Sequence, residues 1–247
     1  MLKQIVIDPG HGGSSIGASY KGRKEQDDTL RLSLAVRDAL LTQDGIDVKM
    51  TREDDSNPSI EERCNIANEW NADYFLSIHR NAFKENVANG VEAWVLSTAE
   101  INGETYNKAD AIVVAICNTT PFGYRGTKLG APAYKDYGVN RLTRMSSCLL
   151  EVGFVDNVSD NAIFDAYFSE IALAIAKGTM QAVGLNYKMP IIKGDADGDG
   201  KVTASDARLI LRASVGLDDV ELERGDIDGD GKTTASDARE ALRMSIE

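Results

Sequence analysis

The sequence predicts an α/β domain, with a mostly parallel sheet flanked by helices, followed by a small all-α module. Short apolar runs alternate with segments of helical periodicity over residues 1–187, and strands that alternate with helices form parallel sheets. Near the C-terminus an acidic motif occurs twice, and each copy leads into an amphipathic segment. We therefore expect one domain at residues 1–187, a linker at 188–193 and a second domain at 194–247.

The composition narrows the class of protein. Of the 247 residues 43% are hydrophobic and 27% are charged, which is ordinary for a folded globular chain. The net charge is −12, and residues 191–247 carry half of it, so we expect no nucleic-acid partner. No apolar run approaches the ~20 residues of a membrane span, so we expect no membrane insertion. With no CxxC pair, we expect reduced, buried thiols at Cys64, Cys117 and Cys148.

The elements of the first domain are predicted from periodicity and turn residues. Strands are expected at residues 3–7, 48–51, 74–78, 91–96 and 148–150. Helices are expected at residues 30–40, 58–70, 108–118 and 164–183. Residues 14–24 and 121–137 are polar or rich in Gly, Pro and Tyr, so we expect loops there, the second of which lines a cleft.

Both histidines of the chain follow a predicted strand. His11 lies in the Gly-rich turn after the first strand, and His79 directly follows residues 74–78. Sites in α/β folds are built at strand ends, so the two imidazoles suggest one shared site. The alternative is a separate structural role for each.

Two carboxylates can join this site. Glu151 ends the strand at 148–150, and an unpaired buried carboxylate is costly, so it should face a site or an ion. Glu25 begins a helical segment, where acidic residues are favoured, but Asp27 and Asp28 already fill that role. Two imidazoles and one carboxylate, with water in the fourth position, form a common catalytic zinc set. A nearby glutamate can take the proton of that water.

Residues 3–187 resemble the zinc-dependent N-acetylmuramoyl-L-alanine amidases of bacteria and phages. The matching blocks, in order, are residues 5–13 (IVIDPGHGG), 24–25 (KE), 51–52 (TR), 63–73 (R…AN…AD), 77–81 (SIHRN) and 150–154 (LEVGF). The resemblance implies that His11, Glu25 and His79 bind one Zn²⁺ and that Glu151 is the catalytic carboxylate. It also implies hydrolysis of the amide between N-acetylmuramic acid and L-alanine of peptidoglycan.

Other residues near these blocks have less certain roles. Arg80, Asn81 and Arg141 are either substrate contacts or solvated surface residues. Ser146-Ser147-Cys148 departs from the family, whose members often have a proline before the last strand. That change concerns the entry to the strand, and we expect the site to remain intact.

The acidic motif of the tail has the spacing of a calcium loop. Residues 195–206 recur as 226–237, with carboxylates at loop positions 1, 3 and 5, glycine at 6 and a backbone carbonyl at 7. Position 12 is Asp instead of the usual Glu. We expect two structural Ca²⁺ ions. The predicted ligand residues are Asp195, Asp197, Asp199, Lys201, Asp206, Asp226, Asp228, Asp230, Lys232 and Asp237.

Each calcium loop leads into an amphipathic helix, and the two helices are expected to pair across a small core. The repeated apolar positions are Ala207, Ile210, Leu211 and Val215 in one copy and Ala238, Ala241, Leu242 and Ile246 in the other. The alternative is a solvated acidic tail, which a duplicated full motif disfavours.

Residues 194–247 resemble type I dockerins, which bind cohesin domains on bacterial scaffolds. The resemblance implies that loop positions 10 and 11 contact the partner. These residues are Ala204, Ser205, Ala235 and Ser236, identical in both copies, which would allow two binding orientations. Binding to the cell wall, or stabilisation of the enzyme, are the alternatives for this module.

The whole chain is thus predicted to be a peptidoglycan amidase that acts on the cell wall outside the cytoplasmic membrane. Because no signal peptide precedes the first strand, we expect a phage-type endolysin released with a holin, or a secreted enzyme whose signal has been removed. The alternative function is a non-catalytic peptidoglycan-binding protein that is displayed on a scaffold through its dockerin.

Overall fold

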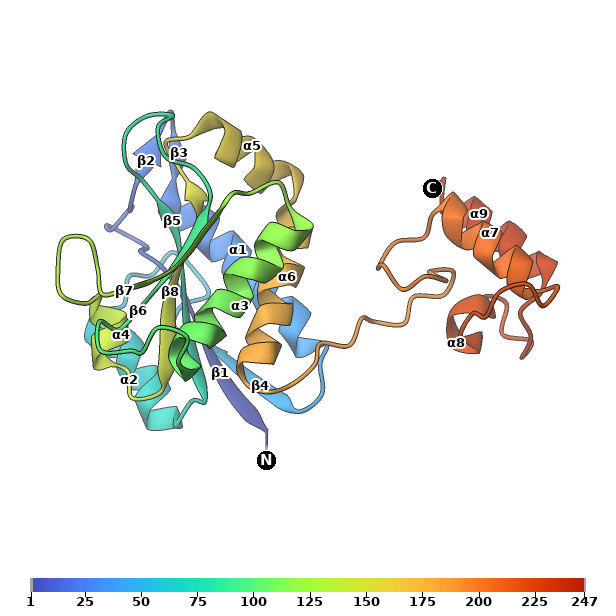
Figure 1. Ribbon diagram of the computed structural model, residues 1–247, viewed down its shortest axis with the longest axis horizontal. Coiled ribbons are helices and arrows are strands. Elements are labelled where there is room, and N and C mark those ends of the chain that lie inside the picture. The colour runs from blue at the N-terminus through green and yellow to red at the C-terminus, as the bar shows by residue number, and fades with distance from the viewer. Residues whose placement is uncertain (1, 247) are drawn as a thin grey trace. The chain divides into compact units, whose positions relative to one another are not determined.

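The computed structural model describes residues 2–246 and divides into two compact units, Met1–Tyr187 and Lys188–Glu247 (Figure 1). The first is an α/β unit and the second is helical. Among the described residues, none of the helices is both long and apolar enough to cross a bilayer.

The first unit is built on a six-stranded sheet of order β4-β1-β5-β8-β6-β7. All neighbouring strands run parallel except β6 and β8, which confirms the predicted mostly parallel sheet. The strands are β1 Lys3–Pro9, β4 Ile46–Met50, β5 Tyr74–Asn81, β6 Val91–Val95, β7 Tyr124–Leu129 and β8 Ser146–Phe154. A separate hairpin pairs β2 Ser19–Tyr20 with β3 Arg23–Lys24.

Helices cover both faces of the sheet (Figure 1). The larger core lies against α1, α3 and α6, and a smaller core on the other face lies against α2 and α4. The helices are α1 Glu25–Leu41, α2 Ile60–Trp70, α3 Glu104–Thr119, α4 Gly138–Leu142, α5 Val158–Ala166 and α6 Phe168–Ala182.

The strand periodicity of two decides where a site can form. Phe75 and Leu149 lie in the smaller core, and His79 and Glu151 follow them on the same face at the carboxyl ends of β5 and β8. Each strand thus buries its apolar residues under α2 and α4, then presents a polar group beyond them.

Three predictions of secondary structure were wrong. Residues 121–137 contain β7, an edge strand that exposes Tyr124 and Arg125 and so lacks apolar alternation. The single helix predicted at 164–183 is two helices, α5 and α6, which meet at Tyr167. No Gly or Pro marks that junction in the sequence. The predicted loop at 14–24 contains the β2–β3 hairpin, whose two-residue turn has positive φ at both positions.

The cysteines are free thiols, as expected, but only two are buried. Cys64 and Cys148 lie in the cores, and Cys117 is half-buried. Burial raises the pKa of the thiols of Cys64 and Cys148 to about 12 and that of Cys117 to about 11. All three are therefore protonated and unreactive at neutral pH.

The second unit pairs α7 Ala204–Ala213 with α9 Ala235–Met244 and includes a short helix, α8 Leu222–Gly225. The predicted pairing of two loop–helix repeats across a small core is present, but only half of the predicted apolar positions are buried. Ala207, Ile210, Ala238 and Ala241 form the core. Leu211, Val215, Leu242 and Ile246 are 48%, 66%, 49% and 81% exposed, because a two-helix unit buries only one narrow stripe of each helix.

Candidate active site

The loop that carries His11 is held by two arginines. Arg63 of α2 donates hydrogen bonds to the carbonyls of Pro9 and His11, both at 2.7 Å. Arg52 donates to the carbonyls of Pro9 and Gly10 at 3.0 and 2.9 Å. Such bonds hold His11 with φ at 62°, a left-handed conformation that His adopts more readily than most residues.

Asp8, just before this loop, is the anchor of a buried polar network. Its carboxylate accepts hydrogen bonds from Arg63 at 2.7 Å, from the Thr51 hydroxyl at 2.6 Å and from the Ser77 hydroxyl at 2.6 Å. Asp8 is 1% exposed and Arg63 is 4% exposed. The network therefore ties β1, β5 and α2 together below the site.

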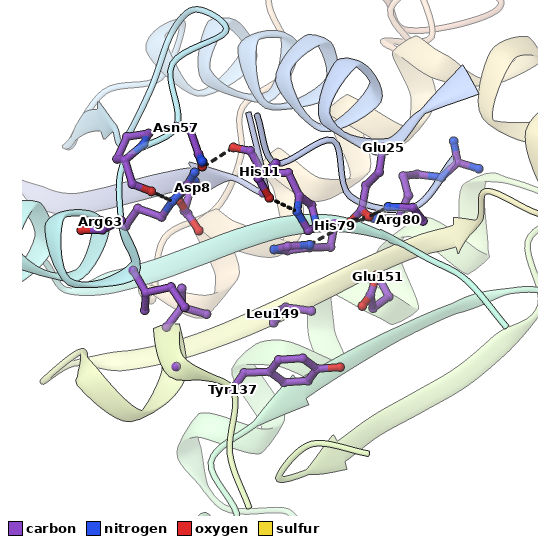
Figure 2. A pocket seen from close by; sticks show the side chains of 18 of the residues that line it. Asp8, His11, Glu25, Asn57, Arg63, His79, Arg80, Tyr137, Leu149 and Glu151 are labelled. Carbon is purple, nitrogen blue, oxygen red and sulfur yellow. Dashed lines mark hydrogen bonds and ion pairs between the residues drawn. The ribbon is translucent and has the colours of Figure 1, made fainter. Parts of the chain in front are cut away.

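His11, Glu25 and His79 meet although 68 residues separate the first from the last (Figure 2). One carboxylate oxygen of Glu25 lies 3.2 Å from His11 Nε2, and the other lies 2.9 Å from His79 Nδ1. One potential ligand atom from each of the three residues lies within 4.8 Å of the others. The arrangement therefore brings all three predicted zinc ligands together.

Two glycines make room for this cluster. A Cβ on Gly10 would lie 2.4 Å from the His79 ring, and a Cβ on Gly17 would lie 2.5 Å from Glu25 Oε2. Any other residue at either position would displace a ligand side chain. On the far side of its ring, His11 Nδ1 lies 3.1 Å from the Ser15 hydroxyl, which leaves Nε2 for a metal ion.

The electrostatics of the cluster suit a cation. Burial opposes ionisation of Glu25, but its hydrogen bonds to His11 and His79 hold the pKa of this carboxyl well below its usual range. The backbone N–H groups of Ala18 and Arg80 also donate to it, at 2.7 and 3.1 Å. A buried, ionised carboxylate between two imidazoles is a donor set that zinc prefers.

Glu151 lies on the strand beside His79. The register of β5 and β8 pairs these two residues directly (Figure 2). Glu151 is buried, and its Oε2 atom has no hydrogen-bond partner among the described residues. Burial, together with the negative charges of Glu25 and Glu92, raises the pKa of Glu151 well above its usual value. An unpaired oxygen of this kind is suited to bind a water molecule or a substrate group.

These residues line a cavity of about 690 Å³. His11, Glu25 and His79 lie on one wall, and Tyr137 and Leu149 lie across from them (Figure 2). The cavity continues along the start of α2, past Asn57 and Pro58. It is large enough for a substrate of several sugar or amino-acid groups.

Two buried charged residues near the site were missed or misjudged from the sequence. Glu92 stands opposite Glu151 across β6 and β8 and accepts hydrogen bonds from Arg125 and Lys128, both at 2.6 Å. Arg80 is 2% exposed, so its predicted surface alternative is wrong. For Glu92, the one signal in the sequence was the alternation within β6, which places this residue on the same face of the sheet as Glu151.

The tail places six of its predicted calcium ligands in two clusters. Carboxylates of Asp195, Asp197 and Asp199 lie close together in the first loop, and those of Asp226, Asp228 and Asp237 in the second. The other two acidic ligands, Asp206 and Asp230, fall outside these clusters. Asp206 accepts hydrogen bonds from the N–H groups of Ala196 and Asp197, and Asp230 accepts one from the N–H of Lys232.

The aspartates at position 12 of the two loops form hydrogen bonds at the helix starts. Asp206 and Asp237 each complete a capping box with a threonine at the start of α7 or α9. Position 7 of the first loop, Lys201, donates its N–H to Asp199 at 2.8 Å. The predicted partner-binding residues are all exposed in the first turns of these helices: Ala204, Ser205, Ala235 and Ser236.

Comparison with known families agrees with both units. The family model described as N-acetylmuramoyl-L-alanine amidase matches residues 5–181, and the type I dockerin domain model matches residues 193–241. The amidase match covers more than half of the chain, and the dockerin match covers most of the second unit.

Two relatives with similar sequences are also described as N-acetylmuramoyl-L-alanine amidases. The chain is 37% identical over 188 residues to the N-acetylmuramoyl-L-alanine amidase CwlM of Bacillus licheniformis, which covers 75% of this chain and 70% of the relative. It is 32% identical over 210 residues to the sporulation-specific N-acetylmuramoyl-L-alanine amidase of Bacillus subtilis (strain 168), which covers 79% and 78%.

Solved structures share the fold of the first unit. The N-acetylmuramoyl-L-alanine amidase of Clostridium difficile 630 superposes with a TM-score of 0.68 at 29% identity, over 74% of this chain and 97% of that one. The catalytic domain of CwlV from Bacillus (Paenibacillus) polymyxa var. colistinus gives 0.67 at 28% identity, over 75% and 100%. The chain therefore belongs to the N-acetylmuramoyl-L-alanine amidases, which act on peptidoglycan, and it carries a type I dockerin domain.

Proposed function

We propose that the amidase reaction depends on one Zn²⁺ ion held by His11, Glu25 and His79, with Glu151 as the catalytic carboxylate. The observation that carries the proposal is the meeting of the three ligand side chains within 4.8 Å on one wall of the cavity. The ionised Glu25, and the unpaired oxygen of Glu151 on the neighbouring strand, fit the same assignment.

The reaction follows from these positions. A bound zinc ion polarises a carbonyl oxygen and lowers the pKa of water. Glu151 takes a proton from the attacking water, whose oxygen bonds to the carbonyl carbon of the lactyl group. As the C–N bond breaks, Glu151 returns the proton to the departing amino group of L-alanine. Burial and the neighbouring carboxylates raise the pKa of Glu151, which makes its carboxylate a stronger base toward water than a solvated glutamate.

Metal analysis of the purified full chain tests the zinc assignment. We expect one zinc ion per chain, and we expect His79→Ala to lose both the zinc and the release of L-alanine amino groups from purified walls. The dockerin domain should keep its calcium in that variant, so calcium content is an internal control. An active wild-type enzyme without zinc, or a His79→Ala variant that retains it, would contradict the assignment.

The same measurement separates the enzyme from the alternative of a non-catalytic wall-binding protein. Such a protein would sediment with walls without releasing amino groups. The four site residues argue against that alternative, because binding alone does not require three clustered metal-ligand side chains beside an unpaired carboxylate.

We further propose that the second unit binds two Ca²⁺ ions and docks on a cohesin domain. The supporting observation is that α7 and α9 expose Leu211 and Leu242 at equivalent positions, on the same helices as the exposed Ala-Ser pairs. Calcium would offset most of the net charge of −6 in residues 191–247, and without it repulsion among the carboxylates should loosen the unit.

Cohesin capture by the full chain tests the docking proposal. We expect capture in calcium and none with chelator. Ser205→Arg or Ser236→Arg alone should leave capture nearly unchanged, because each copy offers an equivalent surface, whereas the double variant should lose it. Loss of capture in a single variant would exclude two equivalent orientations. Calcium-dependent sedimentation with walls, without cohesin capture, would instead assign the unit to wall binding.

The place of action follows from the substrate, which lies outside the cytoplasmic membrane. We propose that residues 1–187 are the catalytic domain, 188–193 the linker and 194–247 the docking domain. A phage-type lysin with holin-dependent release, and a secreted enzyme whose signal has been removed, both stay predictions. Docking on a cohesin would favour the secreted enzyme, since cohesins belong to bacterial scaffolds.

A further inference from the structure

The first turn of α1 carries a proposed zinc ligand and begins without a side-chain cap. Glu25 is the first residue of the helix, and the preceding residue, Lys24, makes no side-chain capping bond. The backbone N–H groups of Glu25 and Gln26 donate instead to the carbonyls of Ala18 and Ile16, at 2.8 and 3.2 Å. A metal ligand, however, must be held to within about 0.5 Å of its productive position. The bonds to Ala18 and Ile16 hold the turn to the preceding loop, and a further contact is needed to hold it to β5, which carries His79.

Arg80 provides that connection. It follows His79 directly on β5, and its backbone N–H donates to Glu25 Oε1 at 3.1 Å. Its guanidinium donates to Asp28 at 2.6 Å, and Asp28 lies three residues after Glu25 on the same turn of α1. Arg80 thus contacts the proposed ligand Glu25 through its backbone and directly follows the proposed ligand His79 in the chain. Its side chain also pairs with Asp28 on the helix that carries Glu25.

The guanidinium of Arg80 is itself held in place. Its second terminal nitrogen donates to Asn161 of α5 at 2.8 Å, and its carbon lies 4.1 Å from the centre of the Phe164 ring. Its Nε atom has no partner among the described residues. A buried cation with an unsatisfied donor is a poor way to stabilise a fold, so stability alone does not account for an arginine here.

We infer that Arg80 is a positioning residue for the metal site: through Asp28 it fixes the first turn of α1 so that Glu25 faces His11 and His79. This inference rests on the proposed zinc function. It does not make Arg80 a catalytic residue, since its guanidinium points to α1 and α5.

Zinc affinity of the full chain, measured by competition with a chromophoric chelator, tests the inference. Outer-shell partners of metal ligands typically contribute 10–100-fold to affinity, so we expect Arg80→Met to weaken zinc binding by about that factor. Arg80→Lys keeps the charge beside Asp28 and should recover part of the loss. The absorption spectrum of the cobalt-substituted protein should also change in Arg80→Met, because the Glu25 ligand is displaced.

Arg31→Met is the matched control. Arg31 lies 3.2 Å from Asp28 and contacts the Phe164 ring, but it belongs to α1 itself and is half exposed, so its loss leaves the link to β5 intact. We expect less than a twofold change in zinc affinity. Equal affinities for Arg80→Met and wild type, or equal losses for Arg80→Met and Arg31→Met, would overturn the inference. A wild-type chain that binds no zinc would instead refute the proposed function.

Because a buried arginine can be needed for folding, the apo forms are first compared by circular dichroism. If Arg80→Met does not fold, Asp28→Asn removes the same charged contact with little change of shape, together with the contacts from Arg23 and Arg31 to Asp28. It should weaken zinc binding by a similar factor, and unchanged affinity in folded Asp28→Asn would overturn the inference.

Discussion

Glu151→Gln should lower kcat for amide hydrolysis by about 10³-fold while zinc stays bound. Glutamine keeps the shape of the side chain but cannot take a proton from water, and general acid–base catalysis contributes about 10²–10⁴-fold. Glu151 supplies none of the three clustered metal ligand atoms, so the metal content should not change. The release of amino groups from purified walls and the zinc content of the same preparation check the two halves of this prediction.

The size of the expected loss in kcat depends on Glu151 being the residue that transfers the proton, with no other side chain able to replace it. Glu53→Gln is a suitable control, because Glu53 is 65% exposed and pairs with the surface residue Arg37. Its activity should match that of the wild type. If Glu151→Gln retained more than about a tenth of the activity, general base catalysis by Glu151 would be excluded.

Asp8→Ala should destabilise the first unit by about 3–5 kcal/mol, the usual effect of removing one partner of a buried ion pair. Arg63 would remain as a buried cation, and the hydroxyls of Thr51 and Ser77 would lose their acceptor. Urea unfolding followed by tryptophan fluorescence measures this effect. Both tryptophans of the chain, Trp70 and Trp94, lie in the first unit, so the signal reports that unit alone.

Two further variants separate the charge effect from general damage. Asp38→Ala removes an exposed partner of Arg37 and should change the free energy of unfolding by less than about 1 kcal/mol. Combining Asp8→Ala with Arg63→Met removes the stranded cation and should restore part of the lost stability. If Asp8→Ala and Asp38→Ala had similar effects, the network around Asp8 would not hold the site together.

The proposed site could be predicted from the sequence because each residue follows a local signal. His11 and His79 end apolar runs, and Glu151 is a carboxylate at the end of a buried strand. Parallel strands bring their carboxyl ends to one edge of a sheet, so residues far apart in the chain could be assigned to one site. The proposed calcium loops could also be predicted from the sequence, since the spacing of their carboxylates is local and occurs twice.

Tertiary contacts decided the features that carry no local signal. The break at Tyr167 carries no Gly or Pro, and the edge strand β7 lacks apolar alternation, so periodicity could not reveal them. Leu211 and Leu242 have the pattern of core residues, yet a unit of two short helices is too small to bury them.

The sequence by itself determined the α/β class, the two units and the proposed set of metal ligands, because spacing and residue type are enough to specify strand ends and loop chemistry. Only the tertiary structure decided which charged residues lie next to the proposed metal site. Arg80 and Glu92 look like surface residues in the sequence, and burial beside Asp28 and Glu151 gives each its environment. Such pairings depend on the neighbours that folding brings together, and those neighbours are distant in the chain.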